Sequence, residues 1–224
     1  GTDSFLNITP SKIQIKKAKK ITIKILKTIS SKKDIENITI NKIWIGDLIY
    51  DTYLRSKNLP TINWKSSSFI QHLHDSLNIF VAWEDFLENN NIRAINVSHC
   101  VYNTAIPLRI SLKKGIEVYQ TNLSHTYKLK LNNMFAYNDF HYFSKIFSRL
   151  PEELQKAGKI EARRRIEKRF SGMVGVDMSY SKKSAYGKIS KKRLISKSPR
   201  KKILIATHCF YDSPHSYGKN LFPD

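Results

Sequence analysis

The sequence predicts an α/β fold built on a doubly wound parallel sheet. Apolar, β-branched segments at 37–46, 93–98 and 116–119 have the composition of buried strands. Helical patterns separate these segments, and the order strand, helix, strand, helix, strand is typical of a parallel sheet with crossover helices. The chain has 224 residues, of which 41% are apolar, so it is long enough to bury a core.

Two of the intervening helices have clear signals. Serines at 66–68 open an amphipathic helix of about 20 residues, and a second helix runs from Ala105 to Lys114 and stops at Gly115. Residues 11–31 mix lysines with isoleucines, and their length and charge favour a helix over a strand. The stripe of the first helix consists of Phe69, Leu73, Leu77, Phe80, Val81, Phe86 and Leu87.

The first candidate site is the segment 43–55, where the predicted strand ends at Gly46. Glycine there allows a tight turn and a close backbone approach. Asp47 is expected to cap the next helix, whose free N–H groups suit a phosphate or a sugar hydroxyl. Because a carboxylate repels phosphate, a sugar hydroxyl or a catalytic base role fits Asp47 better. An ordinary capped helix is the alternative.

The second candidate site is the segment 97–109. His99 follows the predicted strand 93–98, at the sheet edge where open α/β folds bind ligands. This position makes His99 a candidate base or ligand contact, with a structural histidine as the alternative. Arg109 lies on the next predicted helix, where residue chemistry alone favours a surface or ion-paired role.

The third candidate site is a polar loop at 208–218, after a predicted strand at 202–208. A loop so dense in donors and acceptors needs partners for them, which favours ligand binding. A metal site and a Ser–His nucleophile pair are weaker alternatives, because the spacing matches no zinc motif and no nucleophile elbow. The candidate substrate-binding residues are His208, Tyr211, Asp212, Ser213, His215, Ser216 and Tyr217.

The formal net charge is +21, and ten Lys or Arg lie in 181–202 without any acid. This excess indicates an anionic partner, either nucleic acid, anionic lipid or a phosphorylated substrate. No helix-turn-helix, zinc-finger or RNA-recognition signature accompanies it, which disfavours nucleic acid. The two cysteines show neither metal spacing nor a disulfide framework, as expected for reduced thiols in the cytoplasm. No apolar run is long enough for a membrane span.

Three strings carry a resemblance to a known family: Ile-Gly-Asp-Leu-Ile-Tyr-Asp-Thr-Tyr-Leu-Arg at 45–55, Ser-His followed by Ile-Pro-Leu-Arg and Lys-Lys-Gly within 98–115, and His-Cys-Phe-Tyr-Asp-Ser-Pro-His-Ser-Tyr at 208–217. They resemble bacterial capsule and O-antigen biosynthesis proteins, which are similar to GT-B glycosyltransferases. The resemblance extends over residues 40–224 and is loose across 120–200. It implies two Rossmann-like domains that face a cleft and transfer a sugar from a nucleotide-sugar to a glycan or lipid-linked acceptor.

The resemblance also implies roles for individual residues. Asp47, Asp51 and His99 are the candidate catalytic bases, and no cofactor or metal is expected. Positively charged or backbone donors would stabilise the departing diphosphate. The candidate substrate contacts, besides those of the 208–218 loop, are Gly46, Tyr50, Asn103 and Arg109.

The predicted organisation has three parts: an acceptor-side domain at 1–180, a basic linker or loop at 181–201, and the start of a donor-binding domain at 202–224. Both ends fall inside recognisable elements, so the chain is interpreted as an inactive fragment of a cytoplasmic enzyme. The basic segment is expected to favour the inner membrane surface. The alternatives are a basic nucleic-acid-binding module and a non-catalytic sugar-binding protein at the membrane surface.

Overall fold

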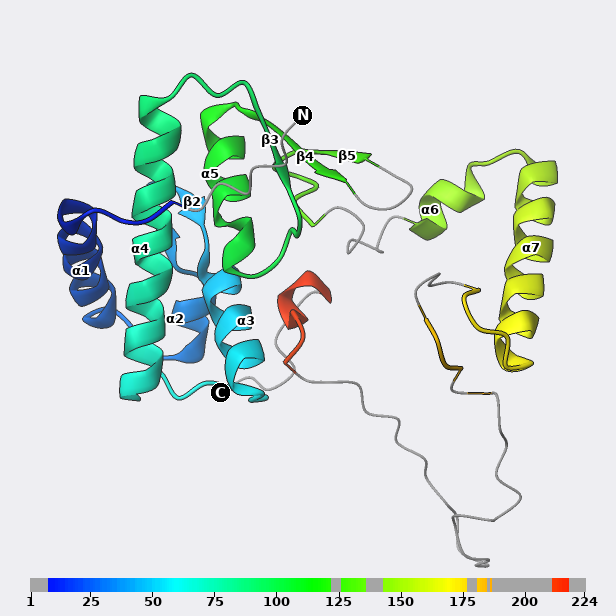
Figure 1. Cartoon of the computed structure of the whole chain (residues 1–224), viewed down its shortest axis with the longest axis horizontal. Coiled ribbons are helices and arrows are strands. Elements are labelled where there is room, and N and C mark those ends of the chain that lie inside the picture. The colour runs from blue at the N-terminus through cyan, green and yellow to red at the C-terminus, as the bar shows by residue number, and fades with distance from the viewer. Residues whose placement is uncertain are drawn as a thin grey trace, which may run out of the picture. The chain divides into compact units, whose positions relative to one another are not determined.

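The computed structural model of the chain describes residues 8–121, 126–135, 143–176, 181–184, 186 and 211–217 (Figure 1). The chain divides into two compact units, one formed by Gly1–Phe140 with Thr207–Asp224 and the other by His141–Ala206. The predicted boundaries at 180 and 202 differ from this division. The C-terminal segment belongs to the first unit, with residues of the predicted acceptor-side domain.

The first unit begins with the helix predicted over 11–31, which the structure confirms as α1 (Lys12–Leu26). The Ser11 hydroxyl accepts the N–H of Gln14, and the Gln14 side chain accepts the N–H of Ser11, so a capping box starts the helix. A short helix, α2 (Lys32–Glu36), follows after a second capping box at Ser31. These caps satisfy backbone donors that the first turn of each helix leaves free.

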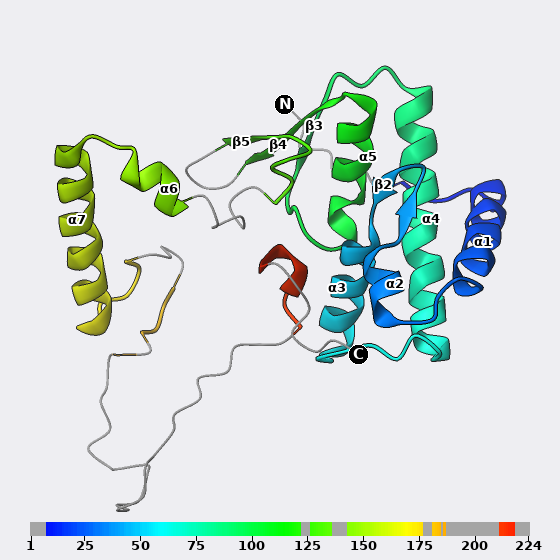
Figure 2. The ribbon, with the colours of Figure 1, turned by 180° about the vertical axis from the view of Figure 1, so that it is seen from behind.

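The core of the first unit lies around α4 (Ser67–Asn89), which confirms the predicted amphipathic helix. In both views α4 runs between α1 and α5 (Ile106–Lys114) (Figure 1 and Figure 2). The stripe residues Phe69, Leu73, Leu77 and Phe80 are all fully buried. Helix α3 (Gly46–Lys57) adds more apolar side chains to the same core.

The single strand predicted over 37–46 is wrong, because the chain reverses inside it. β1 (Thr39–Ile40) pairs antiparallel with β2 (Ile43–Trp44) as a short hairpin. Asn41 and Lys42 form the turn with φ angles of 50° and 63°. Two successive residues with positive φ give the tight reversal of a two-residue hairpin loop, and asparagine adopts that region more readily than most residues.

The main sheet of the described residues has three strands in the order β3-β4-β5. β3 (Ala94–Val97) and β4 (Glu117–Thr121) are parallel, with α5 as their crossover helix. This confirms the predicted strands at 93–98 and 116–119 and the helix stop at Gly115, whose φ is 74°. β5 (Thr126–Leu129) was not predicted and pairs antiparallel with β4. The fold is therefore α/β with a mixed sheet, and the predicted first strand lies in the separate hairpin.

The described regular elements of the second unit are helices. It contains α6 (Phe143–Ser148) and α7 (Glu152–Phe170). Acids in the first turn of α7 and bases in its last turn match the helix dipole. The predicted strand at 202–208 and most of the basic segment at 181–201 lie outside the described residues.

Candidate functional site

Helix α3 carries two predicted carboxylates, Asp47 and Asp51, one turn apart on its inner face. Their exposed fractions are 1% and 3%, so neither is a solvated helix cap. Asp47 also lies inside the helix, whose N-cap residue is Ile45 without a side-chain cap. The expected capping role of Asp47 is therefore wrong, because its side chain turns inward to other partners.

Gly46 makes the close backbone approach that the sequence predicted, but the approaching group is α2. A Cβ atom at Gly46 would lie 2.2 Å from the carbonyl oxygen of Ile35 and 2.4 Å from that of Glu36. The Gly46 N–H also donates to the carbonyl of Ile38 at 3.0 Å. The need for glycine thus has a steric explanation within the fold, and its N–H already has an acceptor.

Asp47 forms a buried ion pair with Arg109 of α5. An Arg109 Nη2–H donates to Asp47 Oδ2 at 2.7 Å, and an Nη1–H donates to the carbonyl of Trp44 at 3.2 Å. The guanidinium also lies over the rings of Trp44 and Phe135, at 4.8 and 5.3 Å from their centroids. Arg109 is 2% exposed, so the ion-paired reading is confirmed and the surface reading is wrong.

Asp51 binds His215 of the 3₁₀ turn η4 (Pro214–Tyr217). The two side chains meet with His215 Nδ1 at 2.5 Å from Asp51 Oδ1, and the His215 backbone N–H donates to Asp51 Oδ2 at 3.3 Å. His215 Nε2 is buried and lies 3.3 Å from Glu36 Oε1, in an orientation that makes no hydrogen bond. The fully buried Tyr50 packs edge-on against the imidazole at 5.2 Å.

The environment raises the pKa of all three titratable members of this cluster. Burial raises the pKa of Asp47 even though Arg109 lowers it, and burial raises that of Asp51 to about 6 against the hydrogen bond from His215. Burial lowers the pKa of His215, but its bond to Asp51 and the charges of Asp51, Asp47 and Glu36 outweigh this and raise it. The titrations of Asp51 and His215 are therefore coupled, because the protonation state of each group shifts the pKa of the other.

An outer polar edge, formed by Arg55, Tyr102 and Asp212, lies beside the buried cluster. Arg55 donates to Asp212 at 3.3 Å and lies over the Tyr102 ring at 4.7 Å, and the Tyr102 hydroxyl also bonds Asp212. Burial and the bond to Asp212 raise the pKa of Tyr102 to about 12. The side chains of Arg55 and Asp212 are 59% and 45% exposed, so this edge is accessible from solvent.

Two backbone outliers occur at this edge. Tyr102 has a φ of 61° and Ser213, next to Asp212, has a φ of 48°. Left-handed backbone at residues other than glycine costs of order 1–3 kcal/mol and is common at binding sites. The segments that carry Tyr102 and Asp212 are therefore held in conformations that their residue types disfavour.

Asn103 has partners inside the protein. Its N–H donates to Thr52 Oγ1 and its side-chain amide donates to Ser76 Oγ, both at 2.8 Å. The side-chain oxygen Oδ1 is buried and has no partner among the described residues. Asn103, the residue after Tyr102, therefore ties the turn before α5 to α3 and α4.

The remaining predicted residues have mixed positions. His99 is exposed at the end of β3, and no hydrogen bond or ion pair within the described segments joins it to the cluster. Tyr211 is half-buried and packs against the core. Ser213 and Ser216 are buried, and the Ser216 hydroxyl donates to the Ser213 carbonyl at 2.8 Å.

The side chains of two further predicted residues lie outside the described part of the structure. His208 lies outside the described residues, and for Tyr217 only the backbone in η4 is described. Sequence reasoning missed Glu36, Arg55 and Tyr102. Arg55 and Tyr102 lie within the candidate segments 43–55 and 97–109, whereas Glu36 ends a five-residue helix and gave no signal.

A search of the described residues finds no group of three or more His, Cys, Asp or Glu side chains that could hold a metal ion. Within the same residues, no helix is both long and apolar enough to cross a membrane.

Comparison with known proteins identifies no relative of this chain. No protein-family model, no curated protein and no solved structure matches it. An assignment of function therefore depends on the residues of the chain and on the geometry described above.

Proposed function

We propose that the protein acts in bacterial surface-polysaccharide synthesis as a glycosyltransferase of the GT-B type, with the doubly wound domain of that class. It transfers a sugar from a nucleotide-sugar to a glycan or lipid-linked acceptor at the cytoplasmic face of the membrane. One observation carries the proposal: the three strings that resemble capsule and O-antigen proteins meet in one polar cluster. The bonds Asp47–Arg109 and Asp51–His215 join the first string to the second and third.

The Asp51–His215 pair supports a base function better than Asp47 or His99. A neutral imidazole accepts a proton at Nε2 from a sugar hydroxyl, while the carboxylate of Asp51 stabilises the imidazolium that forms. Asp47 is already neutralised by Arg109 at 2.7 Å. The acceptor hydroxyl would approach Nε2 by displacing Glu36, whose side chain is 26% exposed.

The outer polar edge supports sugar recognition. A carboxylate, a guanidinium and a phenol within one exposed group offer both donors and acceptors to sugar hydroxyls. The guanidinium of Arg55 also suits a diphosphate, since arginine binds phosphate oxygens in pairs. We expect the acceptor or the leaving group to contact this edge, above the buried base.

The test is a screen of nucleotide-sugars with the purified full-length protein, followed by variants of the edge. Arg55→Gln or Asp212→Asn should lower kcat/KM by about 10- to 100-fold, as expected for one lost hydrogen bond to a charged group. Arg93→Gln removes another exposed arginine, at the start of β3, and should leave kcat/KM unchanged. Absence of saturable hydrolysis or transfer with every donor would contradict the proposed function.

The base assignment has its own test. His215→Gln should lower kcat by about 10²- to 10⁴-fold and remove the acid limb of the pH–rate profile. Circular dichroism and thermal unfolding show whether the variant remains folded. A folded variant with the wild-type pH–rate profile would exclude His215 as the base while leaving the sugar-transfer function open.

A further inference from the structure

Helix α1 presents a continuous row of lysines to solvent, which we name the α1 lysine face. Successive members are three or four residues apart, or directly adjacent, so they share one side of the helix. The opposite side holds the buried Ala18 and Thr22 and packs on α4. All six side chains of the face are exposed: Lys12, Lys16, Lys19, Lys20, Lys24 and Lys27.

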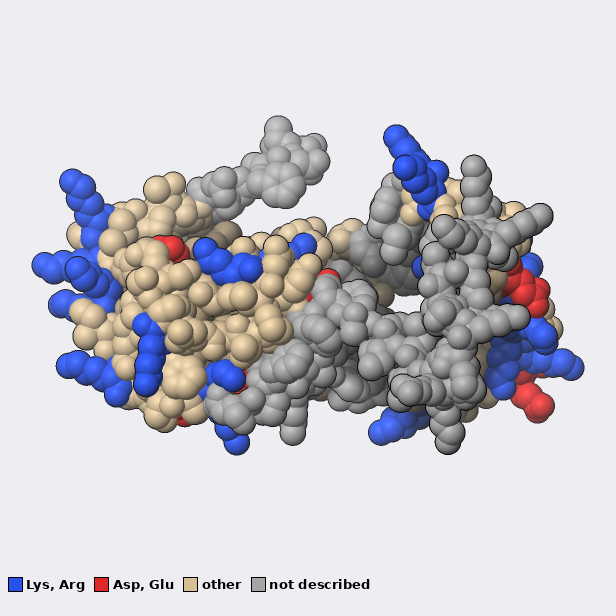
Figure 3. All heavy atoms as spheres, turned by 90° about the horizontal axis from the view of Figure 1, so that it is seen from below, with Lys and Arg blue, Asp and Glu red and all other residues tan. Residues whose placement is uncertain are grey.

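The α1 lysine face has no ion-pair partner among the residues that the structure describes. The helix contains no acid, and none of the six lysines forms an ion pair with a described residue. Only Lys17, at the margin of the face, pairs with Glu84 and Asp85 of α4. Lysines at i and i+4 repel one another and destabilise a helix, so this row costs stability unless an anionic partner covers it. Figure 3 shows the basic side chains projecting from the side of the first unit where α1 lies.

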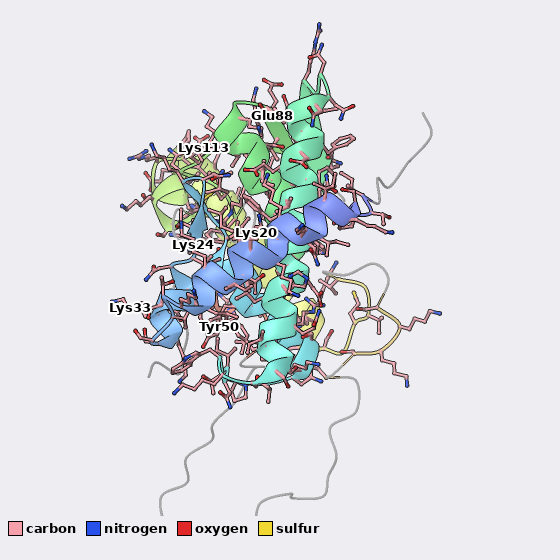
Figure 4. The ribbon with its side chains drawn as sticks, turned by 90° about the vertical axis from the view of Figure 1, so that its left-hand side faces the viewer. Lys20, Lys24, Lys33, Tyr50, Glu88 and Lys113 are labelled. Carbon is pink, nitrogen blue, oxygen red and sulfur yellow. The ribbon has the colours of Figure 1, made fainter. Side chains whose placement is uncertain are left out.

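Two isoleucines lie among these lysines with their side chains in water. Ile13 is 82% exposed and Ile23 is 48% exposed. Figure 4 looks onto this side, with α1 crossing in front of α4 and Lys20 and Lys24 labelled along it. Cationic side chains interspersed with exposed apolar ones are typical of helices that lie on an anionic membrane surface. Nucleic-acid sites favour arginine and aromatic residues, and α1 has neither.

We propose that the α1 lysine face docks the protein on an anionic lipid bilayer, with Ile13 and Ile23 entering the headgroup region. The lysines gain from the negative surface potential, and the two isoleucines bury apolar surface that water now covers. The inference does not depend on the proposed sugar transfer, although a membrane-docked enzyme would lie next to a lipid-linked acceptor.

The test measures binding of the full chain to vesicles of phosphatidylcholine with about 30% phosphatidylglycerol, an anionic lipid, at about 0.15 M salt. The triple variant Lys16→Gln, Lys20→Gln, Lys24→Gln should bind about 100-fold more weakly, since each lysine near such a surface contributes roughly fivefold. The matched control replaces Lys57, Lys65 and Lys130, three exposed lysines on other elements, by glutamine. It makes the same change in net charge and should retain most of the binding.

A local measurement separates α1 from the other basic segments of the chain. Acetylation followed by mass spectrometry should show that anionic vesicles protect the lysines of α1 and leave Lys57, Lys65 and Lys130 reactive. Ile13→Ser with Ile23→Ser should weaken vesicle binding but leave binding of a DNA duplex unchanged. Equal loss in the two triple variants, no protection of α1, or vesicle binding insensitive to the isoleucines would overturn the proposal.

Discussion

Replacing Arg109 by methionine tests the electrostatics of the buried cluster most directly. Arg109 is 2% exposed and Asp47 is 1% exposed, and their 2.7 Å bond is the only cation contact that the described residues provide to this carboxylate. Methionine keeps much of the apolar stem against the Trp44 and Phe135 rings but removes the charge. Breaking a buried pair by removing one partner costs about 3–5 kcal/mol, a large share of the roughly 5–15 kcal/mol that stabilises a domain.

The loss should depend on pH, because the remaining partner can be protonated. Burial already raises the pKa of Asp47 in the native protein, and Arg109 is the main group that lowers it. Without Arg109 the folded-state pKa rises further, while the unfolded value stays at 3.8. Above pH 3.8 the folded variant then holds one more proton than the unfolded chain, so its stability falls as pH rises, by up to about 1.4 kcal/mol per pH unit.

Urea unfolding at pH 5, 6, 7 and 8, followed by circular dichroism, measures this dependence. The stability difference from wild type should grow with pH for Arg109→Met. It should not grow with pH for Asp47→Leu, because the titrating carboxylate is gone and the guanidinium of Arg109 keeps its charge throughout this range. The double variant should be more stable than either single one, since no unpaired buried charge remains. A loss for Arg109→Met that is equal at pH 5 and pH 8 would refute the reasoning.

Two further predictions concern α3 and its contacts. Gly46→Ala places a Cβ atom 2.2 Å from a carbonyl oxygen of α2 and should lower the free energy of unfolding by at least about 2 kcal/mol. The added Cβ atom of Gly115→Ala meets no atom within 4 Å, so this variant should lose only about 1 kcal/mol, because of the φ of 74°. A larger loss for Gly115→Ala than for Gly46→Ala in urea unfolding would contradict this. Asp51→Asn should lower the pKa of His215 in an NMR titration, because the bond to Asp51 is the largest contribution that raises it. Folded Asp51 keeps its proton up to about pH 6 against 3.8 when unfolded, so its contribution to stability is full below pH 3.8 and declines as pH rises to about 6. Asp51→Asn should remove that slope, and an unchanged slope or an unchanged His215 pKa would contradict the assignment.

Local signals made the long helices predictable. The apolar stripe of α4 repeats with the helical period over 23 residues, so the helix and its buried face follow from spacing alone. The end of α5 follows from Gly115, since glycine adopts the left-handed conformation needed there more easily than any other residue. Both features depend on residues a few positions apart.

The strands were harder to predict because their signals are short or ambiguous. The alternation over 37–46 suits one strand as well as two halves of a hairpin, and Asn41-Lys42 lacks the glycine that usually marks the turn. β5 has only four residues, Thr-Tyr-Lys-Leu, and it forms a strand because it pairs with β4. An antiparallel strand of this kind changes a parallel sheet into a mixed one, and the local sequence pattern does not predict such a strand.

For the site, residue identities were predictable but partners were not. The sequence singled out Asp47, Asp51 and His215 from their segments, yet 164 residues separate the two members of the Asp51–His215 pair. The burial that converts Asp47 from a helix cap into a salt-bridge partner depends on α5, 62 residues downstream. His99 shows the opposite case, because its position at the end of β3 was correct but the cluster forms elsewhere.

The two carboxylates of α3 have partners of different kinds: the partner of Asp47 keeps its charge at all ordinary pH values, whereas the partner of Asp51 can be protonated or deprotonated. Asp47 faces Arg109, whose charge does not change with pH, and this bond holds α3 to α5. Asp51 faces His215, whose imidazole can gain or lose a proton, and this bond holds the 211–217 segment to α3. Deprotonation of His215 therefore weakens the attachment of the C-terminal segment and leaves the α3–α5 frame intact. That segment also carries Asp212 of the outer polar edge, so the titratable bond positions both the proposed base and one of the proposed ligand contacts.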